Sequence, residues 1–331
     1  MPDYCVAGED YWFYRYFREK PEVDVVDITS FRWLENIEKE TIRFYISQTL
    51  KVLPRLGQYD LIVSHGMQSG VVLSLLRRFV KIKAKHIVFD IGSFSSASES
   101  GFALKLMQFA SKSIDGLIYH TSSQLEYYQK FFPWLVSKSR FIRFGTDMEF
   151  FDPSGLKAAE DKDGYIICVG YAKRDWATLV EAYQRLDTEL KLRLVGHVDE
   201  RYGKIPGVEQ IPFVPIDDLI NQIYNAAFSV LPLESFNYSY GQMTLLQQMA
   251  LGKCVVAAKV PSLVDYIRDG ETAVLYEPCD AADLAEKMRY VLCDREKKEA
   301  IVRNGQRFLS EECCEPIMVG EIEEFIGRVM G

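Results

Sequence analysis

The sequence predicts an α/β protein built from two domains of parallel βαβ units. Strand-like apolar runs alternate with helical patterns along most of the 331-residue chain, and this alternation is typical of parallel sheets whose strands are joined by helices. The length suits two domains of about 150 residues each. A polar stretch at 154–164 separates the two series of units and predicts a linker between the domains.

The first half contains a series of strand-like runs. Each run is short and rich in branched or aromatic residues, and helical periodicity fills the intervals between them. Helices are expected near 9–18, 35–54, 68–80, 101–113 and 122–131. The expected strands are Val23–Ile28, Asp60–Ser64, Lys85–Ile91, Gly116–His120 and Ser139–Phe144.

The second half repeats the same alternation. A helix is expected from Trp176 onward, with Asp175 as its N-cap, and the tail is expected to be helical at about 282–294 and 315–330. The expected strands are Tyr165–Val169, Lys191–Val195, Glu209–Pro212, Phe228–Leu231, Cys254–Ala258 and Ala273–Leu275. Each half therefore predicts its own parallel sheet.

Composition and charge narrow the class of protein. Apolar residues make up 48% of the chain, which indicates a globular protein with buried cores. The formal net charge is −8, with 19 basic and 17 acidic residues in 1–150 and 20 basic and 30 acidic residues in the remainder. This acidity argues against nucleic acid as the main partner.

Two features of the sequence bear on location in the cell. No run of about 18 uncharged apolar residues occurs, so no transmembrane helix is expected. The opening MPDYCVAGEDYW has acidic residues and no basic start, unlike a secretory signal peptide. We therefore expect a cytoplasmic protein.

The seven cysteines are scattered and form no Cys-x-x-Cys pair. They are Cys5, Cys168, Cys254, Cys279, Cys293, Cys313 and Cys314. Several lie in apolar, strand-like contexts, so the expected state is a small buried side chain in a reducing compartment, with disulfide or zinc binding as the alternative. No His, Asp and Cys cluster has metal-ligand spacing, and no metal is expected.

The segment from Leu233 to Ala257 is the most informative part of the sequence. Its polar and aromatic beginning, Glu234–Tyr240, is followed by Gly241, which permits close backbone approach. The apolar residues after it recur at the helical period until Leu251-Gly252. A polar loop therefore leads into the N-terminus of a buried helix, whose unpaired N–H groups favour phosphate.

A second group of candidate ligands follows the expected strand Tyr165–Val169. Gly170 comes directly after this strand, and the cations Lys173 and Arg174 follow in the same loop. Arg offers a fork of donors suited to phosphate oxygens, whereas Lys is a mobile point charge. The structural alternative is a pair of solvated loop cations.

Two motifs point to a known family. Residues 247–256 read QQMALGKCVV, and residues 144–153 read FGTDMEFFDP. They resemble the donor-binding helix and the end of the first domain, respectively, in GT-B glycosyltransferases, in particular the retaining family 4 (glycosyl transferases group 1). That family's helix usually carries two Glu residues in this region. Here Ser239 and Gln247 stand at the Glu positions, and Cys254 replaces the usual Pro.

The resemblance implies the GT-B fold, with two Rossmann-like βαβ domains facing a central cleft. The implied domains are an acceptor-binding domain at 1–150 and a nucleotide-sugar-binding domain at 151–315. A C-terminal helix at 316–331 would cross back to the first domain. The first strand and glycine-rich loop of the family are matched only by Tyr4–Gly8, so the acceptor side is trimmed or unusual.

The resemblance also implies a set of donor-binding residues in the second domain. Phosphate and ribose contacts are expected from the loop after its first strand and from the start of the motif helix. Base contacts are expected from the loop after its third strand. The implied residues are Gly170, Lys173, Arg174, Phe213, Val214, Ser239, Tyr240, Gly241, Gln242, Thr244 and Gln247.

Four residues are candidates for catalysis. Arg174 and Lys173 would stabilise the departing phosphate, where charge builds up. His65 lies at the end of an expected strand, and open α/β sheets bind ligands at carboxyl strand ends. Asp90 stands at or beside the position of a first-domain His that in the family lies near the sugar. Structural hydrogen bonding is the alternative for both His65 and Asp90.

A basic and apolar stretch occupies 75–85, with the sequence LLRRFVKIKAK. It predicts either a helix end followed by a solvated loop or a membrane-facing patch on the acceptor domain. The mildly basic first half supports the patch, and many relatives act on lipid-linked acceptors. The cations concerned are Arg77, Arg78, Lys81, Lys83 and Lys85.

The resemblance implies a nucleotide-sugar-dependent glycosyltransferase that retains anomeric configuration. Its partners would be a nucleotide sugar and a glycan or lipid-linked saccharide acceptor, met at the inner face of a membrane. A non-catalytic GT-B partner or carbohydrate-binding protein is one alternative, motivated by the absence of both motif Glu residues. A sugar-nucleotide epimerase of GT-B fold is another. An NAD-linked dehydrogenase is excluded, because no Gly-x-Gly-x-x-Gly opens a helix with an acid about 20 residues further on.

Overall fold

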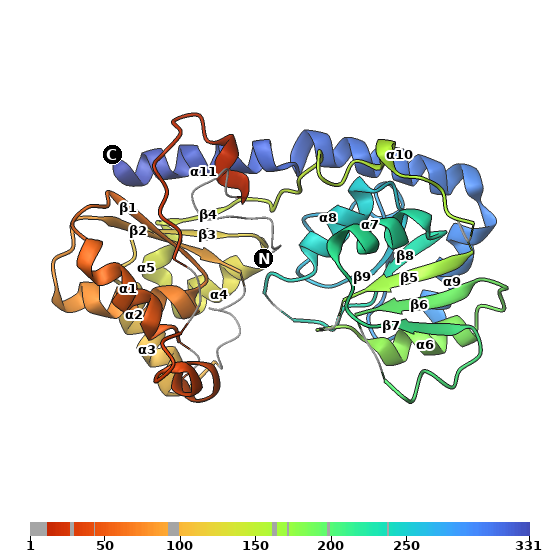
Figure 1. Cartoon of the computed structure of the whole chain (residues 1–331), viewed down its shortest axis with the longest axis horizontal. Helices are drawn as coiled ribbons and strands as arrows, with labels where there is room; N and C mark the ends of the chain where they lie inside the picture. Colours follow the sequence, from red (N-terminus) through yellow and green to blue (C-terminus); the bar gives the residue numbers. More distant parts are fainter. Residues whose placement is uncertain are drawn as a thin grey trace. The chain divides into compact units, whose positions relative to one another are not determined.

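The computed structural model describes residues 12–26, 30–42, 44–91, 99–160, 164–170, 172–196, 199–236 and 238–331. The chain divides into two compact units, each built on a parallel sheet (Figure 1). Unit 1 comprises Met1–Arg143, Asn237–Tyr240 and Met318–Gly331, and unit 2 comprises Phe144–Phe236 and Gly241–Ile317. The predicted class, α/β with a parallel sheet in each of two domains, is confirmed.

The described part of unit 1 contains a four-stranded sheet in the order β1-β2-β3-β4. All three strand pairs are parallel. The two central strands, β2 and β3, are almost fully buried, as expected for parallel strands covered on both faces. The strands are β1 Leu61–His65, β2 Lys85–Asp90, β3 Gly116–Tyr119 and β4 Ser139–Phe141.

Helices cover this sheet and bury their apolar faces against it. Met67, Leu104 and Tyr128 come from three different helices and join the strand residue Leu117 in one core cluster. Figure 1 shows α11 on the opposite side of the strands from α1, α2 and α3. The helices are α1 Ile46–Val52, α2 Met67–Phe79, α3 Phe102–Ser111, α4 Gln124–Phe131, α5 Pro133–Val136 and α11 Glu315–Met330, with the short 3-10 helices η1 Trp12–Tyr16 and η3 Leu53–Arg55 and the π-helix η2 Ile37–Ile42.

Gly116 lets the last helix lie close to the unit 1 sheet. A Cβ atom at this position would be only 2.9 Å from the Phe325 ring and 3.1 Å from Val329, closer than ordinary packing allows. The guanidinium of Arg140 adds two hydrogen bonds to the Glu324 carboxylate, of 3.0 and 3.1 Å. The end of α11 is therefore part of the unit 1 core.

Unit 2 contains a six-stranded sheet in the order β10-β9-β8-β5-β6-β7. Every neighbouring pair is parallel. The strands β5, β8 and β9 have almost no exposed side chain, which is why their sequences lack period-two alternation, whereas the inner strand β6 begins with an exposed Lys191 and alternates. The strands are β5 Tyr165–Val169, β6 Lys191–Val195, β7 Val208–Ile211, β8 Phe228–Leu231, β9 Val255–Ala258 and β10 Val274–Tyr276.

The unit 2 helices begin with capping residues in several cases. Asp175 caps α6 by accepting a hydrogen bond from the N–H of Thr178 (3.0 Å), as predicted. Asp280 and Asp294 cap α9 and α10 in the same way. The helices are α6 Trp176–Gln184, α7 Ile216–Asn225, α8 Gln242–Ala250, α9 Ala281–Cys293 and α10 Arg295–Glu312, with the short turn η4 Pro153–Gly155.

The FGTD motif is held by backbone pairing inside unit 2. The N–H of Thr146 donates to the Cys313 carbonyl (2.9 Å), and the N–H of Glu315 donates to the Thr146 carbonyl (3.0 Å). A Cβ atom at Gly145 would lie 2.6 Å from the Cys314 carbonyl oxygen. The motif therefore needs glycine at this position because the chain leading into α11 runs against it.

Several predicted elements of the first half differ from the structure. Val23–Val26 lies in no strand, and the rest of the expected strand Val23–Ile28 falls outside the described residues. The expected helix 35–54 is broken between η2 and α1. The Glu38 carboxylate causes the break, because it accepts hydrogen bonds from the N–H and the hydroxyl of Ser47 in the first turn of α1. Such a cap stabilises a new helix start rather than a continuous helix.

Two long helices of unit 2, α7 and α10, were not predicted. α10 is mostly charged on its surface and buries only a narrow stripe that includes Ile301, Phe308 and Leu309. Because so few positions of α10 are apolar, its sequence shows only a weak helical periodicity.

The described cysteines are free thiols. Burial raises the pKa of Cys168 and of Cys254 to about 12, so both behave as small apolar side chains. The predicted buried state is right for these two and for Cys313, and wrong for Cys279 and Cys293, which are exposed. Cys5 lies outside the described residues.

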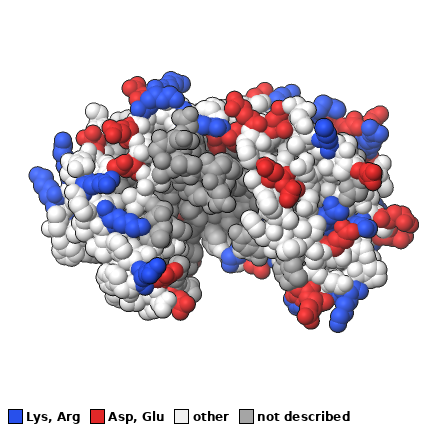
Figure 2. Space-filling view, in the orientation of Figure 1, with Lys and Arg blue, Asp and Glu red and all other residues white. Residues whose placement is uncertain are grey.

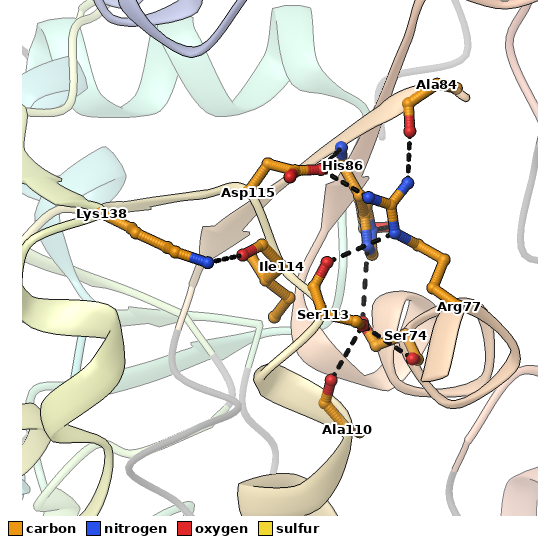
Figure 3. A network of polar contacts seen from close by, with 10 residues as sticks. Ser74, Arg77, Ala84, His86, Ala110, Ser113, Ile114, Asp115 and Lys138 are labelled. Carbon is orange, nitrogen blue, oxygen red and sulfur yellow. Dashed lines mark hydrogen bonds and ion pairs between the residues drawn. The ribbon is translucent and has the colours of Figure 1, made fainter. Parts of the chain in front are cut away.

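Arg77 belongs to the unit 1 interior, as Figure 3 shows. Its guanidinium donates to the Asp115 carboxylate (2.6 Å) and to the carbonyl oxygens of Ser113 and Ala84. The same Asp115 oxygen accepts from the N–H of His86 (2.8 Å). The predicted membrane contact is therefore wrong for Arg77, because its side chain joins α2 to the loops before β2 and β3.

The neighbouring arginines of α2 give a stability prediction. Arg77→Ala should lower the free energy of unfolding by about 2–4 kcal/mol, because it removes the cation that pairs with the Asp115 carboxylate and the donor to two carbonyl groups. Arg78→Ala, one residue on, should cost less than about 1 kcal/mol, because its guanidinium lies over the exposed Phe109 ring. Urea unfolding of both variants measures the difference, and equal losses would contradict the structural role of Arg77.

Candidate functional site

Two loops of unit 2 pair at the carboxyl edge of its sheet. β5 lies between β8 and β6 in the strand order, so the chain leaves β5 toward one side and later returns on the other. Open α/β sheets bind ligands at such a switch point. Here the N–H of Asp175 donates to the Pro232 carbonyl (2.8 Å), and the N–H of Glu234 donates to the Lys173 carbonyl (3.3 Å). The loop after β5 is thereby fixed to the loop after β8.

The guanidinium of Arg174 is held at this switch point by three hydrogen bonds. Its Nε donates to the Val169 carbonyl (3.0 Å), and its Nη1 donates to the Ala172 carbonyl (3.1 Å). Its Nη2 donates to the Thr244 hydroxyl in the first turn of α8 (3.3 Å). The structure therefore brings together two predicted residues, Arg174 and Thr244, that lie 70 positions apart in the sequence.

Gly170 makes room for this guanidinium. Its φ angle is +126°, and a Cβ atom at this position would lie 2.6 Å from Arg174 Nη2. Both the backbone conformation and the close approach of the side chain require glycine. Gly170 therefore lets Arg174 fold back over the end of β5, and its role in binding a ligand stays a prediction.

The start of α8 lies next to Arg174. Gly241 precedes the helix in the left-handed region, with φ of +82°, and a Cβ atom there would lie 2.5 Å from the Leu233 side chain. No side chain caps the helix start by a hydrogen bond. The positive end of the α8 dipole and the Arg174 cation are therefore adjacent, an arrangement that favours an anionic group.

The glutamines of α8 have different environments. Gln247 is half-buried and lies one turn after Thr244. Gln242 is buried, and its amide donates to the Ser262 carbonyl (2.9 Å), so its side chain is used within the protein. Gln248 is fully buried. It therefore faces the interior, although it is next to Gln247 in the sequence.

The side chain of Lys173 is held differently from that of Arg174. Its φ angle is +57°, and its ammonium lies 4.0 Å from the centroid of the Phe236 ring, a distance at which the ring face attracts the cation. Ser239 and Tyr240 are half-buried, and the Tyr238 and Tyr240 rings are 5.3 Å apart. Ser239 and Tyr240 belong to unit 1, whereas Arg174 belongs to unit 2.

Phe213 stands out among the residues predicted to contact the base. It follows the edge strand β7, and 81% of its surface is exposed. Val214, the next residue, is half-buried. A phenyl ring this exposed offers a flat apolar face at the carboxyl edge of the sheet. His197, in the loop after β6, lies outside the described residues.

Asp90 ends β2 of unit 1 and is fully buried. Its carboxylate accepts hydrogen bonds from the Tyr128 hydroxyl and from the Gln124 amide (3.0 Å). Burial and the neighbouring Asp90 charge raise the pKa of Tyr128 well above its usual value. These two hydrogen bonds directly support the alternative interpretation of Asp90, in which it has a structural role.

The sequence analysis missed Gln124 and Tyr128 as partners of Asp90. They lie on α4, four residues apart, and so share one face of the helix. The available signal was a pair of polar side chains at helical spacing directly after β3. The pattern shows a shared face, but only the register of β2 beside β3 aims that face at Asp90.

His65 lies at the end of β1 in an aromatic setting. Its Nε2 is 3.1 Å from the Tyr14 hydroxyl, and its ring packs edge-on against Phe89, with centroids 5.0 Å apart. Phe89 in turn contacts His120 at the end of β3. Desolvation, with a smaller contribution from His120, lowers the pKa of His65 to about 4. The ring is therefore neutral at physiological pH.

Acidic and basic side chains are interspersed over the visible face of unit 2 in Figure 2. The face shown therefore has no extended basic surface of the kind that binds nucleic acid. No group of three or more His, Cys, Asp or Glu within the described ranges could hold a metal ion. A search of those ranges also finds no helix long and apolar enough to span a membrane.

The two sheets and the switch-point site define a class of protein. The structure superposes with a TM-score of 0.70 on sucrose-phosphate synthase from Thermosynechococcus elongatus, at 18% identity, covering 88% of this chain and 79% of that protein. It superposes equally well, at 0.70 and 16% identity, on the Anabaena protein HepE in complex with UDP and glucose, covering 85% and 81%. The chain has the GT-B fold.

Sequence comparison adds the family. Residues 163–294 match the model of the glycosyl transferases group 1 family, the family that the motifs of this chain resemble. The chain is similar to a D-inositol 3-phosphate glycosyltransferase from Geodermatophilus obscurus, 41% identical over 86 residues. That match spans 26% of this chain and only 19% of the relative's length.

The packing of Gly170 gives a prediction for the loop after β5. Gly170→Ala should lower the free energy of unfolding by about 1–3 kcal/mol, because the new Cβ atom would meet the guanidinium and the φ angle is unfavourable for alanine. Gly155→Ala is the matched control, since nothing lies within 4 Å of its Cβ position. Thermal unfolding measures both variants, and a neutral Gly170→Ala would mean that the Arg174 side chain lies elsewhere.

The buried histidines of unit 1 predict a pH dependence. Burial lowers the pKa of His86 to about 3 and that of His120 to about 4, from 6.5. The unfolded chain therefore binds protons before the folded one, and stability should fall as the pH drops from about 6.5 toward 4. The slope should approach about 1.4 kcal/mol per pH unit for each histidine.

The variant His120→Gln tests this pH dependence. Glutamine can still donate to the Ile142 carbonyl that His120 contacts (2.8 Å), but it does not titrate. The slope of unfolding free energy against pH, measured by urea titration between pH 7 and 4, should decrease by up to the contribution of one histidine. An unchanged slope would show that His120 titrates normally.

Proposed function

We propose that this protein is a nucleotide-sugar-dependent glycosyltransferase. The observation that carries the proposal is the fixed Arg174 guanidinium beside the start of α8, at the switch point of a domain that matches the model of the glycosyl transferases group 1 family. A cation and a helix N-terminus form a natural site for a diphosphate. HepE, which has a similar fold, has been crystallised with UDP and with UDP-glucose.

Unit 2 binds the nucleotide sugar in this proposal. Arg174 and the N–H groups of α8 hold the diphosphate and stabilise the charge that forms as it leaves. Lys173 supplies a second cation from the same loop, and Gln247 contacts a ribose hydroxyl in place of the family's Glu. Phe213 offers a flat face for the base. No metal ion is required, because these groups neutralise the diphosphate.

Unit 1 binds the acceptor at the carboxyl ends of β1 and β2. His65 is neutral and lies at the strand end, where it can accept or donate a hydrogen bond to an acceptor hydroxyl. The Asp90 carboxylate already accepts from Tyr128 and Gln124. We therefore assign Asp90 a positioning role, in which it orients α4 beside the strand ends.

The acceptor we propose is a glycan or lipid-linked saccharide, and the transfer retains the anomeric configuration. The resemblance to the retaining family 4 supports retention, and the exposed cations Arg78, Lys81 and Lys83 support contact with a membrane from the cytoplasmic side. Transfer from a UDP-sugar to a saccharide acceptor tests the acceptor class, and NMR of the new linkage tests whether the anomeric configuration is retained. An inverted product would overturn retention. Activity surviving EDTA would support metal independence.

Nucleotide binding gives the direct test of the donor site. Arg174→Ala should weaken UDP binding by roughly 30-fold or more, because it removes charge-assisted hydrogen bonds to phosphate worth about 2–3 kcal/mol. The control is Arg185→Ala, which removes a surface cation paired with Glu181 on α6. Calorimetric titration with UDP, GDP and ADP measures affinity and identifies the base.

Two outcomes would redirect the assignment. A folded protein that binds none of these nucleotides would favour a non-catalytic GT-B partner or carbohydrate-binding protein, the alternative motivated by Ser239 and Gln247 at the motif positions. Conversion of a UDP-sugar to its epimer without acceptor would favour the epimerase. Equal loss of affinity in the Arg174 and Arg185 variants would move the diphosphate away from the switch point.

A further inference from the structure

Two consecutive helical regions of unit 1 contain no acidic residue. In residues 61–89 the charged side chains are Arg77, Arg78, Lys81, Lys83 and Lys85, and in residues 100–114 they are Lys105 and Lys112. The chain as a whole has 47 acidic and 39 basic residues, so a stretch without acid is unusual for it. These regions include α2 and α3, which pack against each other. A cationic surface is therefore built into this part of unit 1.

One face of α3 alternates aromatic and basic side chains. Phe102, Lys105, Phe109 and Lys112 follow one another at intervals of three or four residues, which places them in one row along the helix. All four are exposed, and Phe102 has 80% of its surface exposed. The opposite face, with Leu104 and the other core residues, is buried. The helix is thus amphipathic, yet its outward face carries two large apolar rings.

The end of α2 extends this row. Phe79 is 79% exposed, and its ring centroid lies 6.0 Å from that of Phe109. The Arg78 guanidinium lies 4.9 Å from the centroid of the same Phe109 ring. We call the surface formed by Arg78, Phe79, Lys81, Phe102, Lys105, Phe109 and Lys112 the α2–α3 patch.

We propose that the α2–α3 patch docks on an anionic lipid bilayer. The cations are complementary to acidic lipid headgroups, and the exposed phenyl rings can enter the boundary between headgroups and acyl chains. Arg77 takes no part, because it is bound inside unit 1. This inference rests on the proposed function for its biological role, since a lipid-linked acceptor lies at such a surface. Its test needs no transfer activity.

A second copy of this chain fits the patch less well. In a symmetric dimer each patch would meet its own copy, and the cations of both would then face each other across the contact. Like charges at close range disfavour such an association. An anionic bilayer provides both the opposite charge and an apolar layer beneath it, so it satisfies the lysines and the phenyl rings together.

Vesicle binding of the full chain tests the proposal. The protein should sediment with vesicles of phosphatidylcholine and phosphatidylglycerol but not with vesicles of phosphatidylcholine alone. Lys105→Glu with Lys112→Glu should lower the partition coefficient by about 25-fold or more, at about fivefold for each cation lost. Phe79→Ser with Phe102→Ser should lower it by about tenfold, because two exposed rings no longer enter the bilayer.

Matched controls distinguish an effect of the α2–α3 patch from an effect of overall charge or of any exposed aromatic side chain. Arg303→Glu with Arg307→Glu makes the same change of charge on exposed positions of α10, and Trp33→Ser removes another exposed aromatic of unit 1. Both should bind vesicles as the unaltered protein does. High salt should weaken binding, because it screens the attraction between the lysines and the headgroups.

Three results would overturn the proposal. They are absence of binding to anionic vesicles, equal losses in the control variants, and patch-dependent self-association in size-exclusion chromatography. Titration with UDP should give the same affinity in every patch and control variant. Failed vesicle binding with intact UDP binding would therefore reject the patch and leave the donor site standing, whereas failed UDP binding with intact vesicle binding would do the reverse.

Discussion

The pairing of the loop after β5 with the loop after β8 is the constraint on which the donor site depends. These loops meet because β5 and β8 are neighbours in the sheet although about 60 residues separate them. Backbone hydrogen bonds from Asp175 to Pro232 and from Glu234 to Lys173 fix the two loops together. The hydrogen bond from Arg174 to Thr244 is therefore preorganised, because the backbone holds both residues in place. Fixed donors of this kind cost little reorganisation when charge develops on a ligand.

Glycine serves this arrangement at two positions with different consequences. At Gly170 the absent side chain leaves space for the guanidinium itself, so the glycine acts on the cation directly. At Gly241 it leaves space for Leu233, so the glycine acts on how closely the β8 loop can approach the helix start. Both have positive φ angles. Together they set the distance between the cation and the α8 N-terminus, the two groups we assign to the diphosphate.

Unit 1 uses its ionisable groups in two opposite ways. Asp90, His86 and Arg77 are enclosed and bonded to neighbours, so they maintain the structure of the strand ends and of the loops before β2 and β3. The cations on α3 and at the end of α2 stay exposed, beside exposed phenyl rings. Adjacent residues such as Arg77 and Arg78 fall into different groups because successive helix positions point about 100° apart. A basic run in the sequence is therefore not by itself a basic surface.

The sequence alone determined the α/β class, the parallel sheets and most strands, and it indicated the resemblance to the glycosyl transferases group 1 family, whose model matches residues 163–294. It could do so because buried parallel strands and α/β helices leave strong local patterns, and because the QQMALGKCVV and FGTDMEFFDP motifs combine several fixed positions. It also identified Gly170, Arg174, Gly241 and Thr244 as candidates, since each stands at the end of a strand or the start of a helix.

Only the tertiary structure decided which of these candidates touch one another. Strand order determines that β8 returns beside β5, and no local pattern encodes that neighbour. The same is true of Asp90, whose partners come from α4, and of Arg77, whose carboxylate partner lies 38 residues further on. The first half also shows where local patterns fail: Val23–Val26 looks like a strand but has no ladder partner, and a single buried Glu38 divides an expected helix in two. For Asp90 and Arg77 the deciding contacts join residues 38 positions apart, which no local pattern shows.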